Sequence, residues 1–172
     1  MIKTTIWTRL DIMAKHMTPA LLTFGLVIFN IIPFHLEGFG RIVPLLPIMA
    51  VYHWGIYRSE LLPVYAVFAV GILQDILSGV PIGLNALTFV SVYWFVVSQH
   101  GFFLGKSFPI VWLGFGLILG VVMIVMWIIM AVFFTTLIDA KAALFQYLTT
   151  LGFYPLIAWG FQRWQRTFLR LV

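Results

Sequence analysis

Long stretches without a charged residue most constrain what this chain can fold into. They run over 16–36, 42–57, 61–74, 76–105, 107–138 and 142–162. A transmembrane α-helix needs about 20 apolar residues to cross the roughly 30 Å hydrocarbon core of a bilayer. Of all residues, 63% are hydrophobic and only 9% are charged, whereas charged residues make up about a quarter of a soluble domain. The sequence therefore predicts an all-α polytopic membrane protein.

The breaks between these stretches set the number of predicted helices. They fall at GFGR (38–41), YRSE (57–60), SGVPIG (78–83), GKS (105–107) and DAK (139–141). The break at 78–83 carries no charge and depends on glycine and proline, which favour turns. Six transmembrane helices follow, at about 17–36, 42–57, 61–78, 82–103, 109–136 and 142–162. We expect one integral membrane domain over 1–172 and no soluble domain, because neither tail is long enough to bury a core.

The distribution of basic residues predicts the orientation of the helices, because lysine and arginine concentrate in cytoplasmic loops. Five crossings would leave four basic residues inside and six outside. Six crossings with a cytoplasmic N-terminus leave only Arg41 and Lys141 outside, which favours both termini inside. The cytoplasmic set is then Lys3, Arg9, Lys15, Arg58, Lys106, Arg163, Arg166 and Arg170. These flanking positions explain the net charge of +5 without a nucleic-acid partner.

Asp75 is the one acidic residue inside a predicted helix, where a charged side chain costs roughly 2.5–3.5 kcal/mol. Gly71 and Gly79 lie one turn away on either side and predict a groove for a close neighbouring helix. Donors for the carboxylate could come from the backbone of the 78–83 turn or from Asn85. Three roles stay open: capping of an interrupted helix pair, partner binding, and a proton or ion site. His53 lies within about two helical turns of Asp75 in predicted depth, which leaves a pairing of the two side chains open.

Gly116 and Gly120 form a GxxxG pattern within an apolar helix, which predicts close helix packing, most often inside the same chain. Catalytic patterns are missing from the sequence: there is no GxSxG, no HExxH and no phosphate-binding loop. The chain has no cysteine, and its four histidines contain no pair at helical spacing. We therefore expect no enzyme activity, no metal and no cofactor.

Two stretches resemble a known family. LLPVYAVFAVGILQDILSGVPIGLNALTF (61–89) resembles the signature of the rod-shape-determining membrane protein family MreD, and PLLPIMAVYHWGIYR (44–58) resembles the proline-rich second helix of its proteobacterial members. Ser59 departs from the proline that the family pattern has there, and Asn85 occupies a variable position. The residues that match the signature are Gly71, Asp75, Gly79, Pro81, Gly83 and Leu87.

The resemblance implies a non-enzymatic scaffold of the cell-elongation machinery in the bacterial cytoplasmic (inner) membrane, needed for rod shape and side-wall peptidoglycan synthesis. Its expected direct partner is MreC, a single-span protein with a periplasmic domain. MreB, RodA and a transpeptidase are further partners, direct or indirect. The resemblance also implies a compact bundle similar to the substrate-binding components of energy-coupling-factor transporters.

That fold similarity gives an alternative function, a small-solute (vitamin-type) membrane carrier or transporter component. Such a site needs several polar groups that converge in an apolar pocket. We expect the polar residues in the helices to be dispersed, which favours the scaffold. They are Asn30, Gln74, Asp75, Asn85, Ser91, Thr135 and Gln146.

Overall fold

The computed structural model describes residues 6–31, 43–135 and 140–168. Within these ranges the chain is helical and contains no strand. Its elements are α1 (Ile6–Ile31), α2 (Leu46–Tyr57), the short 3-10 helix η1 (Ser59–Leu61), α3 (Val64–Ser78), α4 (Leu84–Ser98), α5 (His100–Phe103), α6 (Phe108–Phe134) and α7 (Ala140–Phe168).

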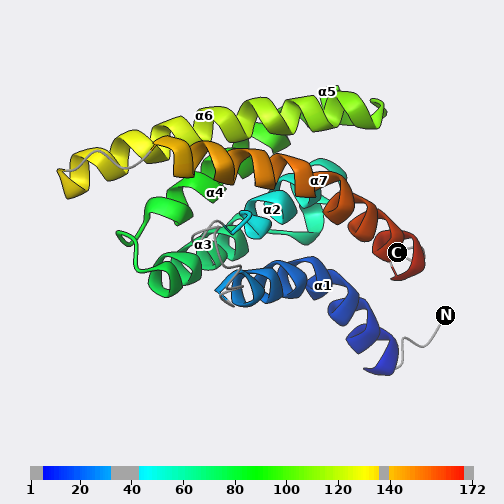
Figure 1. Ribbon diagram of the computed structural model, residues 1–172. Helices are drawn as coiled ribbons and strands as arrows, with labels where there is room; N and C mark the ends of the chain where they lie inside the picture. Colours follow the sequence, from blue (N-terminus) through cyan, green and yellow to red (C-terminus); the bar gives the residue numbers. More distant parts are fainter. Residues whose placement is uncertain (1–5, 32–42, 136–139, 169–172) are drawn as a thin grey trace.

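Helix α2 forms the centre of the bundle and contacts α1, α4 and α7 (Figure 1). Every residue from Leu46 to Ile56 is buried, because this helix is apolar on all its faces. The hydroxyl of Tyr52 donates a hydrogen bond to the carbonyl of Val111 on α6, at 2.9 Å. Its ring packs against Phe115 and Tyr154, with ring centroids 5.1 and 5.7 Å away. These contacts join α2 to α6 and α7.

Two antiparallel pairs complete the bundle. α3 and α4 form a hairpin, and α6 packs along α7 (Figure 1). The first turns of α1 and the last turns of α7 lie at the same end of the molecule, and the α3–α4 turn lies toward the opposite end (Figure 1). This arrangement is compatible with an even number of crossings.

The helices coincide with the six predicted segments, but several bounds differ. The first helix starts at Ile6 and continues through Pro19, whereas its predicted start was 17. The fourth predicted segment is divided into α4 and the single turn α5. The last helix begins at Ala140 and ends at Phe168, whereas the predicted segment was 142–162. The predicted segment ends at 32–36, 42 and 136 lie outside the described residues.

Among the described residues, α6 is the one helix that is both long and apolar enough to cross a membrane by itself. The stretch Met17–Asn30 of α1, and helices α3 and α4, are apolar but shorter. The all-helical fold with a strongly apolar helix is consistent with a membrane protein. The number of crossings and their orientation stay predictions.

Candidate functional site: the α3–α4 hairpin and an amide-lined cavity

Asp75 lies near the end of α3, fully buried, and accepts four hydrogen bonds from the start of α4. Its Oδ2 accepts from the backbone N–H of Gly83 at 2.8 Å and, more weakly, from that of Ala86 at 3.4 Å. Its Oδ1 accepts from the backbone N–H of Asn85 at 2.8 Å and from the Nδ2 of Asn85 at 2.9 Å. All four partners are donors, which matches the acceptor-only chemistry of a carboxylate.

These bonds give partners to the first backbone N–H groups of α4, which have no acceptor within their own helix. Three of those four groups, on Gly83, Asn85 and Ala86, donate to Asp75. The fourth, on Leu84, donates to the carbonyl of Pro81 at 3.2 Å. A negative charge at a helix N-terminus is also favoured by the helix dipole. Asp75 therefore caps α4 from the preceding helix and ties the two together.

The turn between the helices depends on glycine. Gly79 ends α3 with φ at +67° and Gly83 precedes α4 with φ at +102°, both in the left-handed region that side chains with a Cβ rarely adopt. Neither glycine is crowded, since a Cβ at either position would meet no atom within 4 Å. The prediction that Gly79 opens a packing groove is therefore wrong. It is a helix C-cap of the left-handed type.

Gly71 is the residue that permits the close approach of α3 and α4. A Cβ there would overlap the Cα of Ala86, and would lie 2.6 Å from its backbone nitrogen and 3.0 Å from its Cβ. Because these atoms belong to the backbone of α4 or lie next to it, no side-chain rotation can relieve the overlap. Gly71 thus brings the two helices close enough for Asp75 to reach the first turn of α4.

The hydrogen bonds anticipated from the 78–83 turn and from Asn85 are present, whereas the possible pairing of Asp75 with His53 is not. His53 is buried on α2, and its ring packs against Trp54, Tyr57 and Phe161, with centroids 4.7–5.4 Å away. The geometry supports the capping role most directly, because the carboxylate is engaged within the chain. Partner binding through the motif stays a prediction.

Gly116 and Gly120 face α7, as expected for close packing inside the chain. A Cβ on Gly116 would lie 3.1 Å from Cδ1 of Leu151, and a Cβ on Gly120 would lie 3.6 Å from the ring of Tyr147. The Tyr147 hydroxyl donates to the carbonyl of Gly116 at 3.1 Å, and the indole of Trp112 donates to the carbonyl of Leu151 at 3.0 Å. The seam between α6 and α7 therefore combines small residues with two cross-helix hydrogen bonds.

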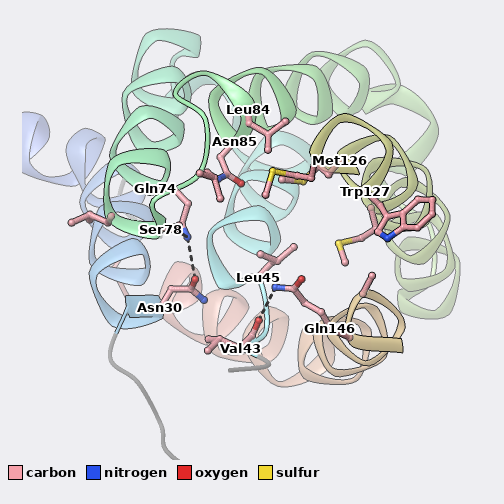
Figure 2. Close-up of a pocket in the computed structure, with 16 residues that line it drawn as sticks. Asn30, Val43, Leu45, Gln74, Ser78, Leu84, Asn85, Met126, Trp127 and Gln146 are labelled. Atoms are coloured by element: carbon pink, nitrogen blue, oxygen red, sulfur yellow. Dashed lines mark hydrogen bonds between the residues drawn. The ribbon is translucent and has the colours of Figure 1, made fainter. Parts of the chain in front are cut away.

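A cavity of about 610 Å³ lies beside the hairpin, between α3, α4, α6, α7 and the end of α1 (Figure 2). Figure 2 shows Asn30 and Gln74 on one wall, Gln146 and Trp127 on the other, and Asn85 near Leu84. Four of the seven polar residues predicted to be dispersed thus line one cavity, and that prediction is wrong. Ser91 and Thr135 are not among the lining residues.

Several lining residues carried no signal in the sequence. Met123, Met126, Met130 and Trp127 come from α6, and Ala142 and Ala143 come from α7. Because α6 is apolar on every face, its sequence does not show which face meets the cavity. Only the packing of α7 against it decides this.

Comparison with known proteins gives the family. A family model described as "rod shape-determining protein MreD" matches residues 11–172. An uncharacterized protein of Rickettsia prowazekii is 32% identical over 91 residues, which are 53% of this chain and 51% of that protein. The chain thus matches about half the length of this relative. No solved structure matches, so the expected likeness to transporter components stays untested. The match over nearly the whole sequence shows that the chain belongs to the MreD family of rod shape-determining membrane proteins.

Proposed function

We propose that this chain is a non-enzymatic scaffold of the cell-elongation machinery that acts by binding MreC. It would be needed for rod shape and side-wall peptidoglycan synthesis. MreB, RodA and a transpeptidase would join the same complex directly or through MreC. In this proposal the chain crosses the bacterial inner membrane six times with both termini in the cytoplasm, so that the α3–α4 turn faces the periplasm.

The observation that carries the proposal, beside family membership, is the cap of α4 by Asp75. Since every oxygen of this carboxylate is already bonded within the chain, the motif fits a rigid hairpin better than a direct ligand of a partner. The hairpin presents apolar side chains near its turn, with Ile82 and Leu87 exposed to 75% and 63%. In a membrane such side chains meet either lipid or a protein partner, and this proposal assigns those of the turn to the partner.

The test is complementation of a rod-shaped bacterium that lacks its own MreD, combined with co-purification of MreC in a mild detergent. We expect the wild-type chain to restore rods and to retain MreC in a fixed ratio. Asp75→Ala should reduce both, because the hairpin loses the cap of α4. The matched control is Glu60→Ala, which removes an exposed acid that forms an ion pair with Arg58.

Equal amounts of each variant in the membrane are required for this comparison. Spherical cells and no MreC retained with the wild-type chain would reject the scaffold. Normal rods and normal MreC retention with Asp75→Ala would show that the acid serves only internal folding. The surface that binds the partner would then lie outside the α3–α4 hairpin.

The small-solute carrier is a second candidate, and the convergence of Asn30, Gln74, Asn85 and Gln146 on one cavity favours it. A carrier and a scaffold differ in what they retain after purification. A water-soluble ligand in native mass spectra would support the carrier, and a stoichiometric complex with a single-span partner would support the scaffold.

A further inference from the structure

The last turns of α7 diverge from α6 and pack against α2 (Figure 1). At Tyr154 the helix still lies beside α6, because the Tyr154 ring stacks on that of Phe115 with centroids 4.3 Å apart. Two turns later the ring of Phe161 packs against Trp54 of α2, with centroids 5.3 Å apart. The side of α7 that faces away from α2 is exposed over these last turns.

The two faces of this part of α7 differ in chemistry. On the inner face, Ala158 and Phe161 are buried in the bundle. On the outer face, Trp159, Arg163 and Arg166 follow one another at spacings of four and three residues, so they lie on one side of the helix. All three are exposed, and Trp159 has 64% of its surface accessible. The outer face therefore combines one indole with two guanidinium groups.

The two arginines are available for an anion from outside the chain. The guanidinium of Arg163 lies over the indole of Trp159, 5.6 Å from the ring centroid, in the geometry of a cation–π contact. Neither Arg163 nor Arg166 forms an ion pair with an acidic side chain among the described residues, whereas Arg58 pairs with Glu60. Arginine presents its N–H donors as a planar fork, which suits the oxygens of a phosphate.

The length of α7 brings these side chains to the depth of lipid phosphates. Its 29 residues extend about 44 Å, whereas the hydrocarbon core is roughly 30 Å thick. About 20 residues cross that core, and counting them from Ala140 leads to Trp159, a residue type favoured at the membrane boundary. Arg163 and Arg166 follow about 6 and 10 Å further along the axis, so their flexible side chains reach the headgroup layer.

We propose that the outer face of α7, formed by Trp159, Arg163 and Arg166, binds the phosphate of an anionic phospholipid in the cytoplasmic leaflet. The guanidinium groups donate hydrogen bonds to the phosphate oxygens, and the indole packs against the glycerol region. A zwitterionic headgroup is disfavoured, because its ammonium group is repelled by the arginines. The depth of the site and the exposed indole favour a lipid over an acidic protein. The site rests on the proposed crossing of the membrane by α7 and not on binding of MreC.

The test uses the full chain, purified in a mild detergent and titrated with dioleoyl-phosphatidylglycerol or dioleoyl-phosphatidylcholine. Both lipids have the same chains and a phosphate, but only phosphatidylglycerol carries a net charge. Native mass spectrometry gives the dissociation constant of the first lipid bound. We expect phosphatidylglycerol to bind about 25-fold more tightly, since a basic residue near the lipid surface supplies roughly a factor of five.

Two double variants locate the binding. Arg163→Gln combined with Arg166→Gln should weaken phosphatidylglycerol binding about 25-fold and leave phosphatidylcholine binding unchanged. Lys106→Gln combined with Lys141→Gln is the matched control, because it removes the same charge from two other exposed positions. It should change the affinity for phosphatidylglycerol by less than about twofold. Both double variants should unfold at the wild-type midpoint in sodium dodecyl sulfate, because all four side chains are exposed.

Four results would overturn the proposal. Equal affinity of the wild-type chain for the two lipids would remove the preference for an anion. Equal loss of affinity in the two double variants would reduce the effect to net charge. Unchanged affinity after loss of both arginines would leave this face to an acidic protein. Displacement of the lipid by inorganic phosphate at the same concentration would make it a site for free phosphate. Rod shape and MreC retention are separate readouts, so failure here is distinguishable from failure of the scaffold.

Discussion

Replacing Asp75 by asparagine removes the charge at the α3–α4 junction with almost no change in volume. The remaining oxygen of the amide can keep the two hydrogen bonds from Asn85. Its NH₂ group then takes the place of Oδ2 and faces the N–H groups of Gly83 and Ala86. The amide NH₂ and these two backbone N–H groups are all donors, and none of the bonds described gives the N–H of Gly83 or of Ala86 another acceptor.

The expected cost follows from these four contacts. Loss of the short bond from Gly83, with its N–H left partly buried, costs about 1–3 kcal/mol. Conversion of the two Asn85 bonds from charge-assisted to neutral adds about 1–2 kcal/mol. The bond from Ala86 is long and adds little. Because a neutral amide is easier to bury than a carboxylate, part of this cost is offset, and we expect a net loss of about 2–4 kcal/mol.

The assay is unfolding in a mild detergent micelle by titration with sodium dodecyl sulfate, followed by far-ultraviolet circular dichroism. The control is Glu60→Gln, an exposed acid whose loss should change the unfolding free energy by less than about 0.5 kcal/mol. If Asp75→Asn unfolds at the same midpoint as this control, the charge of Asp75 contributes nothing to the hairpin, and the capping argument is wrong.

Three further predictions concern packing and topology. Gly71→Ala should destabilise the fold by about 1–3 kcal/mol, because the added Cβ overlaps α4. Gly25→Ala is the control: its Cβ meets no atom within 4 Å, so it should be neutral or stabilise the fold by up to about 1 kcal/mol. The same unfolding titration measures both variants, and equal effects would contradict the close contact of Gly71 with α4. Tyr147→Phe should lower the unfolding free energy by about 1 kcal/mol through loss of the bond to Gly116, and an unchanged midpoint would show that this bond does not hold the α6–α7 seam. Alkaline phosphatase fused at Ala140 should be active and a green fluorescent protein at the C-terminus should fluoresce; the reverse pattern would overturn the six-crossing topology.

The sequence was sufficient for features that depend on local chemistry. Long apolar runs indicated helices, and turn-forming residues placed the α3–α4 break correctly, since Gly79 and Gly83 adopt the positive φ values of such a turn. The donors for Asp75 were also anticipated, because a buried carboxylate requires them. The role of Gly79 was missed, since spacing alone does not distinguish a packing glycine from a helix C-cap.

The cavity could not be predicted, because it depends on how distant helices meet. Asn30 and Gln146 are separated by more than a hundred positions in the chain, and both hold the backbone at the start of α2 through the carbonyls of Pro44 and Val43. Helical periodicity shows which face a residue occupies, but not which other helix that face meets. Convergence of the amides is thus a property of the tertiary fold.

The central helix α2 has a consequence for biogenesis. Its 12 residues span about 18 Å, well short of the roughly 30 Å of the hydrocarbon core. The residues from Leu46 to Ile56 are buried against protein. The neighbouring helices therefore cover the ends of α2, where backbone N–H and C=O groups would lack hydrogen-bond partners in lipid. Among these neighbours, α4 and α7 emerge from the ribosome after α2. Helix α2 therefore reaches its final position only after later parts of the chain have entered the bilayer.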